Sequence, residues 1–140
     1  MNTILRILIK LVVQASLVVF QSGTMHTVTV NITGLDSSDG KLLVGLYDSE
    51  EHFLDKRFKS AIGEISEATG QVVFKDIPDG IYAISFIHDE NDNGKMDTNF
   101  LGIPKEDYGC SNNAKGFMGP PKWEDAKFEL KDNKIVNIQL

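Results

Sequence analysis

The chain contains a single cysteine, Cys110, among its 140 residues. An intramolecular disulfide is therefore excluded, and the stability of the folded protein must come from a hydrophobic core or from a bound ion. The composition is 41% apolar and 24% charged, which fits one globular domain large enough to bury such a core.

Positive charge is also scarce, because 14 Lys and Arg residues face 20 Asp and Glu residues, for a formal net charge of -6. Proteins that bind nucleic acids or anionic lipids need surface patches of Lys and Arg. An acidic chain of this kind is poorly suited to either partner. We therefore expect no nucleic-acid binding.

The one long apolar run lies at the N-terminus, where Leu11 to Phe20 follows the basic residues Arg6 and Lys10. This order of charge and length is typical of a secretory signal peptide, and the run is too short for a comfortable membrane span. The sequence predicts a signal peptide over residues 1–23 and a single domain over residues 24–140. The mature protein is expected to be secreted or to lie in the periplasm or cell envelope, with no stable membrane insertion after cleavage. An uncleaved anchor and a buried first helix are the alternatives.

Short apolar segments recur along the rest of the chain and are typical of β-strands. The clearest alternation is in His26–Thr33, and Ile81–His88 is almost continuously apolar, as in a central strand. About seven such segments without a convincing long helix predict an all-β fold, an antiparallel β-sandwich. The expected strands are residues 26–33, 41–47, 60–67 (the weakest), 70–77, 81–88, 126–130 and 135–140.

The stretch D-E-N-D-N-G-K-M-D, residues 89–97, brings oxygen-bearing side chains together at alternate positions around Gly94. Calcium takes about 6–8 oxygen ligands, and an EF-hand loop supplies them from positions 1, 3, 5, 7 and 9, with Gly at position 6. The same spacing occurs here, so the sequence predicts a calcium site. Its ligands would be Asp89, Asn91, Asn93, the Lys95 carbonyl and Asp97.

Position 12 of this loop, where an EF-hand has a bidentate Glu, is Phe100. Asn99, or Glu106 folding back along the chain, would have to supply the missing ligand. Glu90 and Asp92 would point away from the ion and act on it only through their charge. The alternative is a solvated hairpin, because Asn93-Gly94 is by itself a strong signal for a two-residue turn.

Two blocks of sequence carry a resemblance to a known family. They are F-K-D-I-P-D-G-I-Y-A-I-S-F-I-H-D-E-N-D-N-G-K-M-D-T-N (residues 74–99) and G-I-P-K-E-D-Y-G-C-S-N-N-A (residues 102–114). They resemble the domain of unknown function 2141 family of small exported bacterial proteins. Residues 74–82 are also similar to the strand–turn–strand of transthyretin-like and carboxypeptidase-regulatory-like sandwiches. The resemblance implies an Ig-like or transthyretin-like sandwich of about seven strands outside the cytoplasm, and no particular reaction. Cys110 departs from the family pattern, where we expect an aromatic residue.

Two further groups of residues are candidates for a functional role. Cys110 or Ser111 together with His88 would have the composition of a hydrolase dyad, provided that the fold brings the side chains within about 3 Å. The neutral alternative is a small buried thiol and a polar strand end. The second group comprises Tyr108, Phe117, Pro120, Pro121 and Trp123, which would form either a binding face for a carbohydrate or protein or a lid over the sandwich edge.

From the sequence we therefore expect a non-enzymatic exported module that binds calcium and acts as a binding or structural domain, with an unknown protein or carbohydrate as its ligand. A metal-free structural or interaction domain of the cell envelope is the main alternative. A small Cys/His or Ser/His hydrolase is the more distant one.

Overall fold

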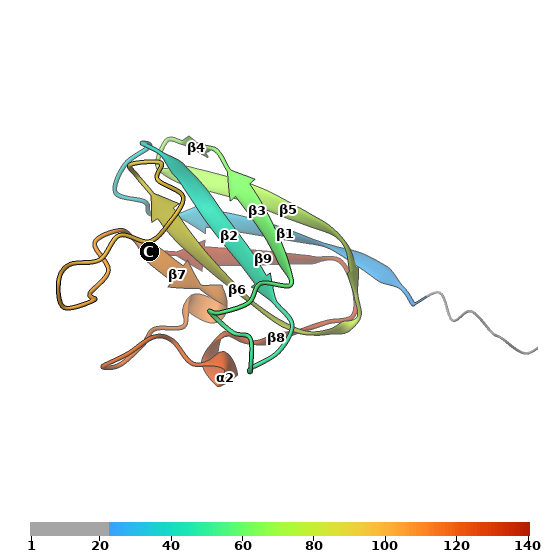
Figure 1. The fold of residues 1–140 in the computed structure, drawn as a ribbon. Helices are drawn as coiled ribbons and strands as arrows, with labels where there is room; N and C mark the ends of the chain where they lie inside the picture. The colour runs from blue at the N-terminus through green and yellow to red at the C-terminus, as the bar shows by residue number, and fades with distance from the viewer. Residues whose placement is uncertain (1–22) are drawn as a thin grey trace, which may run out of the picture.

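The computed structural model describes residues 23–140, which form two packed β-sheets with long loops at one side (Figure 1). One sheet has the strand order β4-β5-β1-β9, and the other has the order β3-β2-β6-β7, with β8 also paired to β6. The strands are β1 (Met25–Thr33), β2 (Lys41–Tyr47), β3 (Lys59–Gly63), β4 (Ile65–Ser66), β5 (Thr69–Pro78), β6 (Gly80–Asp89), β7 (Tyr108–Cys110), β8 (Phe128–Leu130) and β9 (Lys134–Gln139). A 3-10 turn, η1 (Ser111–Asn113), and a short helix, α2 (Trp123–Ala126), lie between β7 and β8.

The core lies between the two sheets and is built from the inward-facing residues of their strands. On β1, Val28, Val30 and Ile32 are fully buried while the residues between them are partly exposed. On β6, Ile84 and Phe86 point into the same cluster. Successive side chains of a strand point to opposite faces of the sheet. The alternation of apolar and polar residues in the sequence therefore gives each sheet one buried face.

The all-β sandwich predicted from the sequence is confirmed, with two differences in detail. Residues 23–140 form nine strands instead of about seven, because the region predicted as one weak strand at 60–67 divides into β3 and β4, and β7 forms in the region read as irregular. The sheets are also not wholly antiparallel, since β9 pairs with β1 in parallel. Strand β5 pairs with one edge of β1 in the antiparallel direction. The chain passes from β8, in the opposite sheet, to β9, which pairs with the other edge of β1.

A second, smaller cluster covers the outer face of the β2–β6 sheet. Trp123 and Ala126 of α2 pack there with Tyr47, Ala83 and Cys110. Phe53, in the loop after β2, contacts Tyr47 and Trp123 edge to face at ring-centroid distances of 5.4 and 5.7 Å. The outer face of this sheet is thus partly closed by loops, and the part left open borders the long excursion after β6.

The predicted signal peptide falls on residues 1–23, and all but the last of these lie outside the described residues. Among residues 23–140, no helix is long and apolar enough to cross a membrane.

Candidate metal sites after strand β6

The end of β6 sends neighbouring side chains to opposite faces of its sheet. His88 continues the inward-facing series of Ile84 and Phe86, whereas Asp89 faces the loop that follows. Both residues are 0% exposed. Two groups of polar residues therefore begin at adjacent positions, one on each side of the strand.

On the loop side, the carboxylate of Asp89 organises the turn by accepting backbone hydrogen bonds. The N–H of Asn93 donates to Oδ1 at 3.1 Å, and the N–H of Gly94 donates to Oδ2 at 2.7 Å. Gly94 has a φ of 82°, a left-handed conformation that glycine adopts without a steric penalty. The Asp89 carboxylate thus stabilises the turn in which residues 90–97 fold back.

Asn91, Asn93 and Asp97 converge on one another within this turn. The side-chain amide of Asn91 donates to Asp97 Oδ2 at 2.6 Å, and that of Asn93 donates to Asp97 Oδ1 at 2.8 Å. The hydrogen bonds from Asn93 and then Asn91 lower the pKa of the Asp97 carboxyl, so this group remains anionic at neutral pH.

Glu106 closes the group from the far end of the excursion, as one of the two sequence alternatives anticipated. Its Oε2 accepts the backbone N–H of Asp97 at 3.1 Å, and the N–H of Lys105 donates to the Asp97 carbonyl at 2.8 Å. Glu106 is only 9% exposed, and its Oε1 is buried without a hydrogen-bond partner among residues 23–140. The loop thus contains a buried carboxylate oxygen that accepts no hydrogen bond from the described residues.

The remaining residues of the predicted site divide as follows. Asn99 caps its own turn, because its Oδ1 accepts the N–H groups of Leu101 and Ile103, and Phe100 is 94% exposed. The backbone N–H of Lys95 donates a hydrogen bond to Asn93 Oδ1 at 3.1 Å. Asp92 turns away from the loop and pairs with Lys41. Glu90 also turns away, toward His88.

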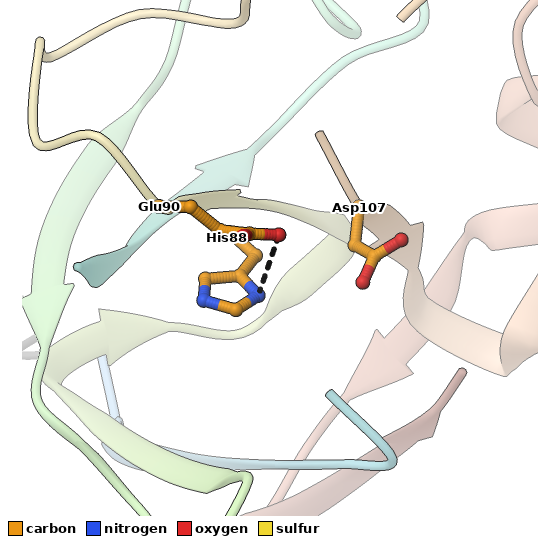
Figure 2. A group of neighbouring side chains, drawn as sticks. All are labelled: His88, Glu90 and Asp107. Carbon is orange, nitrogen blue, oxygen red and sulfur yellow. Dashed lines mark ion pairs between the residues drawn. The ribbon is translucent and has the colours of Figure 1, made fainter. Parts of the chain in front are cut away.

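On the inner side of β6, His88, Glu90 and Asp107 form a second group (Figure 2). One ligand atom from each residue lies within 4.8 Å of the others. The His88 N–H donates to the Asp107 carbonyl at 2.8 Å, which places the two residues opposite each other beyond the β6–β7 pairing. Burial, followed by the neighbouring Asp36 carboxylate, raises the pKa of the Asp107 carboxyl.

This second group was missed from the sequence, where His88 was weighed only as a partner for Cys110 or Ser111. Those two residues are engaged elsewhere. Burial raises the pKa of the Cys110 thiol to about 12, which disfavours the nucleophilic thiolate near neutral pH. The Ser111 hydroxyl is 0% exposed, accepts the Ile84 N–H at 2.9 Å and donates to the Ala126 carbonyl. It thereby joins β6 to α2.

The aromatic residues before and at the start of α2 divide between buried and exposed positions. Trp123 is 8% exposed and packs as part of the lid, whereas Phe117 is 92% exposed.

Tyr108 lines a cleft of about 590 Å³ on the open part of the outer sheet face. In Figure 1, residues 98–106 and 114–122 project on the same side of the sandwich. Both stretches contribute walls to the cleft, which is lined by Leu43, Gly45, Tyr47, Leu54, Arg57, Ser85, Phe86, Ile87, Met96, Gly102, Ile103, Pro104, Tyr108, Cys110, Met118, Gly119, Pro120 and Pro121.

Arg57 is the one charged residue in the lining of this cleft. Its side chain lies over Gly45, next to the Tyr47 hydroxyl. In the part of the chain that the structure describes, no carboxylate lies within ion-pair distance of the guanidinium. Aliphatic, aromatic and proline side chains dominate the rest of the lining, so the cleft combines an apolar body with one positive group.

A family model described as "Uncharacterized protein conserved in bacteria (DUF2141)" matches residues 30–139. The matched range includes both polar groups at the end of β6 and every residue that lines the cleft. Neither a curated protein nor a solved structure matches the chain.

Proposed function

The chain belongs to the DUF2141 family of bacterial proteins, and from that premise we propose that it is an exported β-sandwich module whose loop, residues 89–106, binds calcium. The ligands would be the side chains of Asp89, Asn91, Asn93, Asp97 and Glu106 and the carbonyl of Lys95. The ion would stabilise the module and hold the loop in the shape needed to bind a ligand. A metal-free sandwich with the same fold is the alternative, and dependence on calcium separates the two.

The observation that carries this proposal is the buried carboxylate of Glu106. An acceptor oxygen without a hydrogen bond in a buried position costs free energy, and a bound cation would satisfy it. This oxygen belongs to the residue whose other oxygen holds the Asp97 N–H. In this proposal the Glu106 carboxylate would supply the ligand that Phe100 cannot.

The two asparagines need a local rotation to act as ligands, which in Asn93 also gives up the hydrogen bond that its Oδ1 accepts from the Lys95 N–H. Each directs its amide N–H₂ at Asp97, and half a turn of the terminal amide group replaces that nitrogen with the carbonyl oxygen. With calcium in the loop, the oxygens of Asn91 and Asn93 would then face the ion beside the Asp97 carboxylate. Three acidic residues would balance the ion's charge, since Asp89 and Glu106 contribute as well.

The ion's effect would be to stabilise a long stretch of chain that has few other fixed points. A cation that binds only the folded state stabilises it by RT ln(1 + [L]/Kd), about 2.7 kcal/mol at a hundredfold excess over Kd. Calcium sites of extracellular modules have dissociation constants of about 10⁻⁴–10⁻³ M. Calcium in the millimolar range would therefore hold residues 98–106 in place.

The first test is the thermal unfolding midpoint of the protein purified after expression of the full chain, measured in EDTA and then across micromolar to 10 mM calcium. A stabilisation of about 2.7 kcal/mol corresponds to a rise of about 10 °C for a domain of this size. Magnesium should give a much smaller rise, because it demands octahedral geometry and loses its water reluctantly.

The matched control is Asp132→Asn, which removes an acidic residue in the turn between β8 and β9 and should leave the calcium response unchanged. A midpoint that does not move with calcium, or that moves equally with magnesium, would contradict the proposal. It would favour the metal-free module.

The cleft beside the loop favours a specific kind of ligand. Its volume, about 590 Å³, is in the range of small-molecule sites. The lining is mainly apolar, and Arg57 offers a single positive charge, so we propose a small amphiphile with an alkyl body and an anionic end. A carbohydrate is the alternative ligand, for which the hydroxyls of Tyr47, Ser85 and Tyr108 in the lining would be polar partners. Gly102, Ile103 and Pro104 form one wall, so calcium in the loop would favour binding in the cleft.

This proposal predicts different effects of Arg57→Met on two ligands of equal chain length, octanoate and octanol. The variant keeps the apolar stem and removes the charge. Because the ion pair would be exposed, worth about 1 kcal/mol at most, octanoate should bind about fivefold more weakly while octanol is unaffected. Isothermal titration calorimetry in calcium and in EDTA measures both ligands. Equal losses for the two ligands, or no saturable binding of octanoate, would contradict the assignment of Arg57.

A further inference from the structure

The inner group at the end of β6 contains two polar atoms whose burial needs an explanation. His88 is 0% exposed, and its Nδ1 has no hydrogen-bond partner among residues 23–140. Oδ2 of Asp107 is likewise buried without a partner. Such atoms are rare in folded proteins because each one loses its hydrogen bonds to water, and an unseen ion is one of the accepted explanations.

The tautomer of His88 follows from its other nitrogen. Nε2 lies 2.8 Å from the carbonyl oxygen of Asp39, and a carbonyl can only accept, so Nε2 carries the hydrogen. In a neutral imidazole this leaves the lone pair of Nδ1 free, pointing toward the carboxylates (Figure 2). A histidine that binds a metal typically donates its second N–H to a carbonyl or carboxylate in this way.

The nearest carboxylate oxygen does not replace a hydrogen-bond partner. Oε1 of Glu90 lies 3.9 Å from Nδ1, beyond hydrogen-bond distance. Tetrahedral zinc with ligand distances of about 2.0–2.1 Å separates its ligand atoms by about 3.3 Å. The three atoms, now within 4.8 Å of one another, would have to move closer. Glu90, whose side chain is 41% exposed, can close its own gap of 3.9 Å to Nδ1. Asp107 lies beyond ion-pair distance of His88 but within 4.8 Å, so its side chain would also have to move.

We propose that Nδ1 of His88 and the carboxylates of Glu90 and Asp107 form a second metal site, which binds zinc or a similar divalent transition-metal ion. The mixture of one imidazole nitrogen and two carboxylate oxygens suits zinc, whereas calcium prefers oxygen alone. The carboxylate of Asp36, which lies beside Asp107, or a water molecule would take the fourth position.

This site is separate from the calcium loop although the two share a stretch of chain. The loop would use Asp89 and Glu106, and the inner site would use the adjacent residues His88, Glu90 and Asp107. Alternation along an extended chain sends neighbouring side chains to opposite sides. The inference therefore goes beyond the calcium proposal, does not depend on it, and would survive its failure.

The experiment is a zinc titration by isothermal titration calorimetry, at pH 7.5 with 10 mM calcium present, on the protein purified after expression of the full chain. One equivalent of zinc should bind. His88→Gln and Asp107→Asn should each weaken the binding at least tenfold. Cobalt in place of zinc should give visible absorption bands typical of mixed nitrogen and oxygen ligands, and in NMR the Nδ1 resonance of His88 should shift when zinc is added.

Two controls separate this site from its neighbours. His26→Gln removes an imidazole that pairs with Asp79, and Asp97→Asn alters only the calcium loop, so both should bind zinc as the wild type does. Should His88→Gln fail to fold, Glu90→Gln replaces it, because Glu90 is exposed and its loss should still weaken zinc at least tenfold. Absence of saturable zinc binding, or equal zinc affinity in the wild type and the ligand variants, would overturn the proposal.

Discussion

Asp89→Ala is expected to abolish the calcium response and also to destabilise the calcium-free protein by about 3 kcal/mol, because two backbone N–H groups lose a charged acceptor, each bond contributing about 1.5–3 kcal/mol. These are the N–H groups of Asn93 and Gly94. Asp89 is 0% exposed, so water does not readily replace the carboxylate. The midpoint in EDTA should fall by about 10 °C, and calcium should no longer raise it.

Asn91→Ala is the matched comparison, because Asn91 lies in the same loop but is exposed and accepts no backbone hydrogen bond in the described chain. It should leave the midpoint in EDTA within about 2 °C of the wild type, since surface substitutions change stability by about 0.5 kcal/mol or less, while weakening the calcium response. If Asp89→Ala retains the full calcium-induced rise, Asp89 is not a ligand and its carboxylate serves only the backbone of the turn.

The parts of the fold that the sequence predicts are those governed by local patterns. The alternation in residues 26–33 and the apolar run in residues 81–88 have the periods of a half-buried strand and a central strand, and both strands are present as β1 and β6. The return of Glu106 to the loop was one of two sequence alternatives, the other being Asn99, for the ligand missing at Phe100. In the structure Glu106 does fold back, and its Oε2 accepts the Asp97 N–H.

The features that the sequence does not reveal depend on contacts between distant segments. The parallel pairing of β1 and β9 depends on the route that the chain takes between the sheets after β8. The short strand β7 has too few residues to show a period, and it forms because its backbone pairs with β6. Strand periodicity alone cannot identify either feature.

The inner group of His88, Glu90 and Asp107 illustrates the same limit at the level of a site. Nothing in the sequence pairs His88 with Asp107, because they lie opposite each other only through a backbone hydrogen bond between the end of β6 and the residue before β7. The carbonyl of Asp39, which sets the tautomer of His88, comes from a third segment. One feature of the sequence indicated this group. His88 lies at an even-numbered position like Ile84 and Phe86, so its side chain is expected to face the core, and a polar residue in the core needs a polar partner.

The cleft, too, arises from tertiary structure. A lid over the sandwich edge was one of the two sequence alternatives for the aromatic residues, and Trp123, at the start of α2, packs in this way. The open space remains because the loop after β6 and residues 118–121 cover different parts of the sheet face. Arg57 reaches the cleft from the loop after β2, a segment whose sequence shows only charge mixed with apolar residues.

The turn before β2 provides the second large expected effect, because Gly40 lies against the backbone at the end of β6. A Cβ atom at this position would lie 1.9 Å from the carbonyl oxygen of Asp89, and Gly40 has a φ of 68°. The neighbouring Asp39 carbonyl accepts the hydrogen bond from His88. Any displacement of this turn would therefore disturb both the start of the loop at Asp89 and the orientation of the His88 imidazole.

Gly40→Ala should cost about 3 kcal/mol, of which about 1–2 kcal/mol is the left-handed backbone and the rest the displacement of packed backbone. Gly102→Ala separates these contributions, because Gly102 has a φ of 77° but no atom within 4 Å of the added Cβ. It should cost only the backbone contribution. Urea unfolding in EDTA measures both variants. Equal costs would mean that the approach of Gly40 to Asp89 places no constraint on the fold, whereas a larger cost for Gly40→Ala, together with weakened zinc and calcium binding, would show that this turn supports both metal groups.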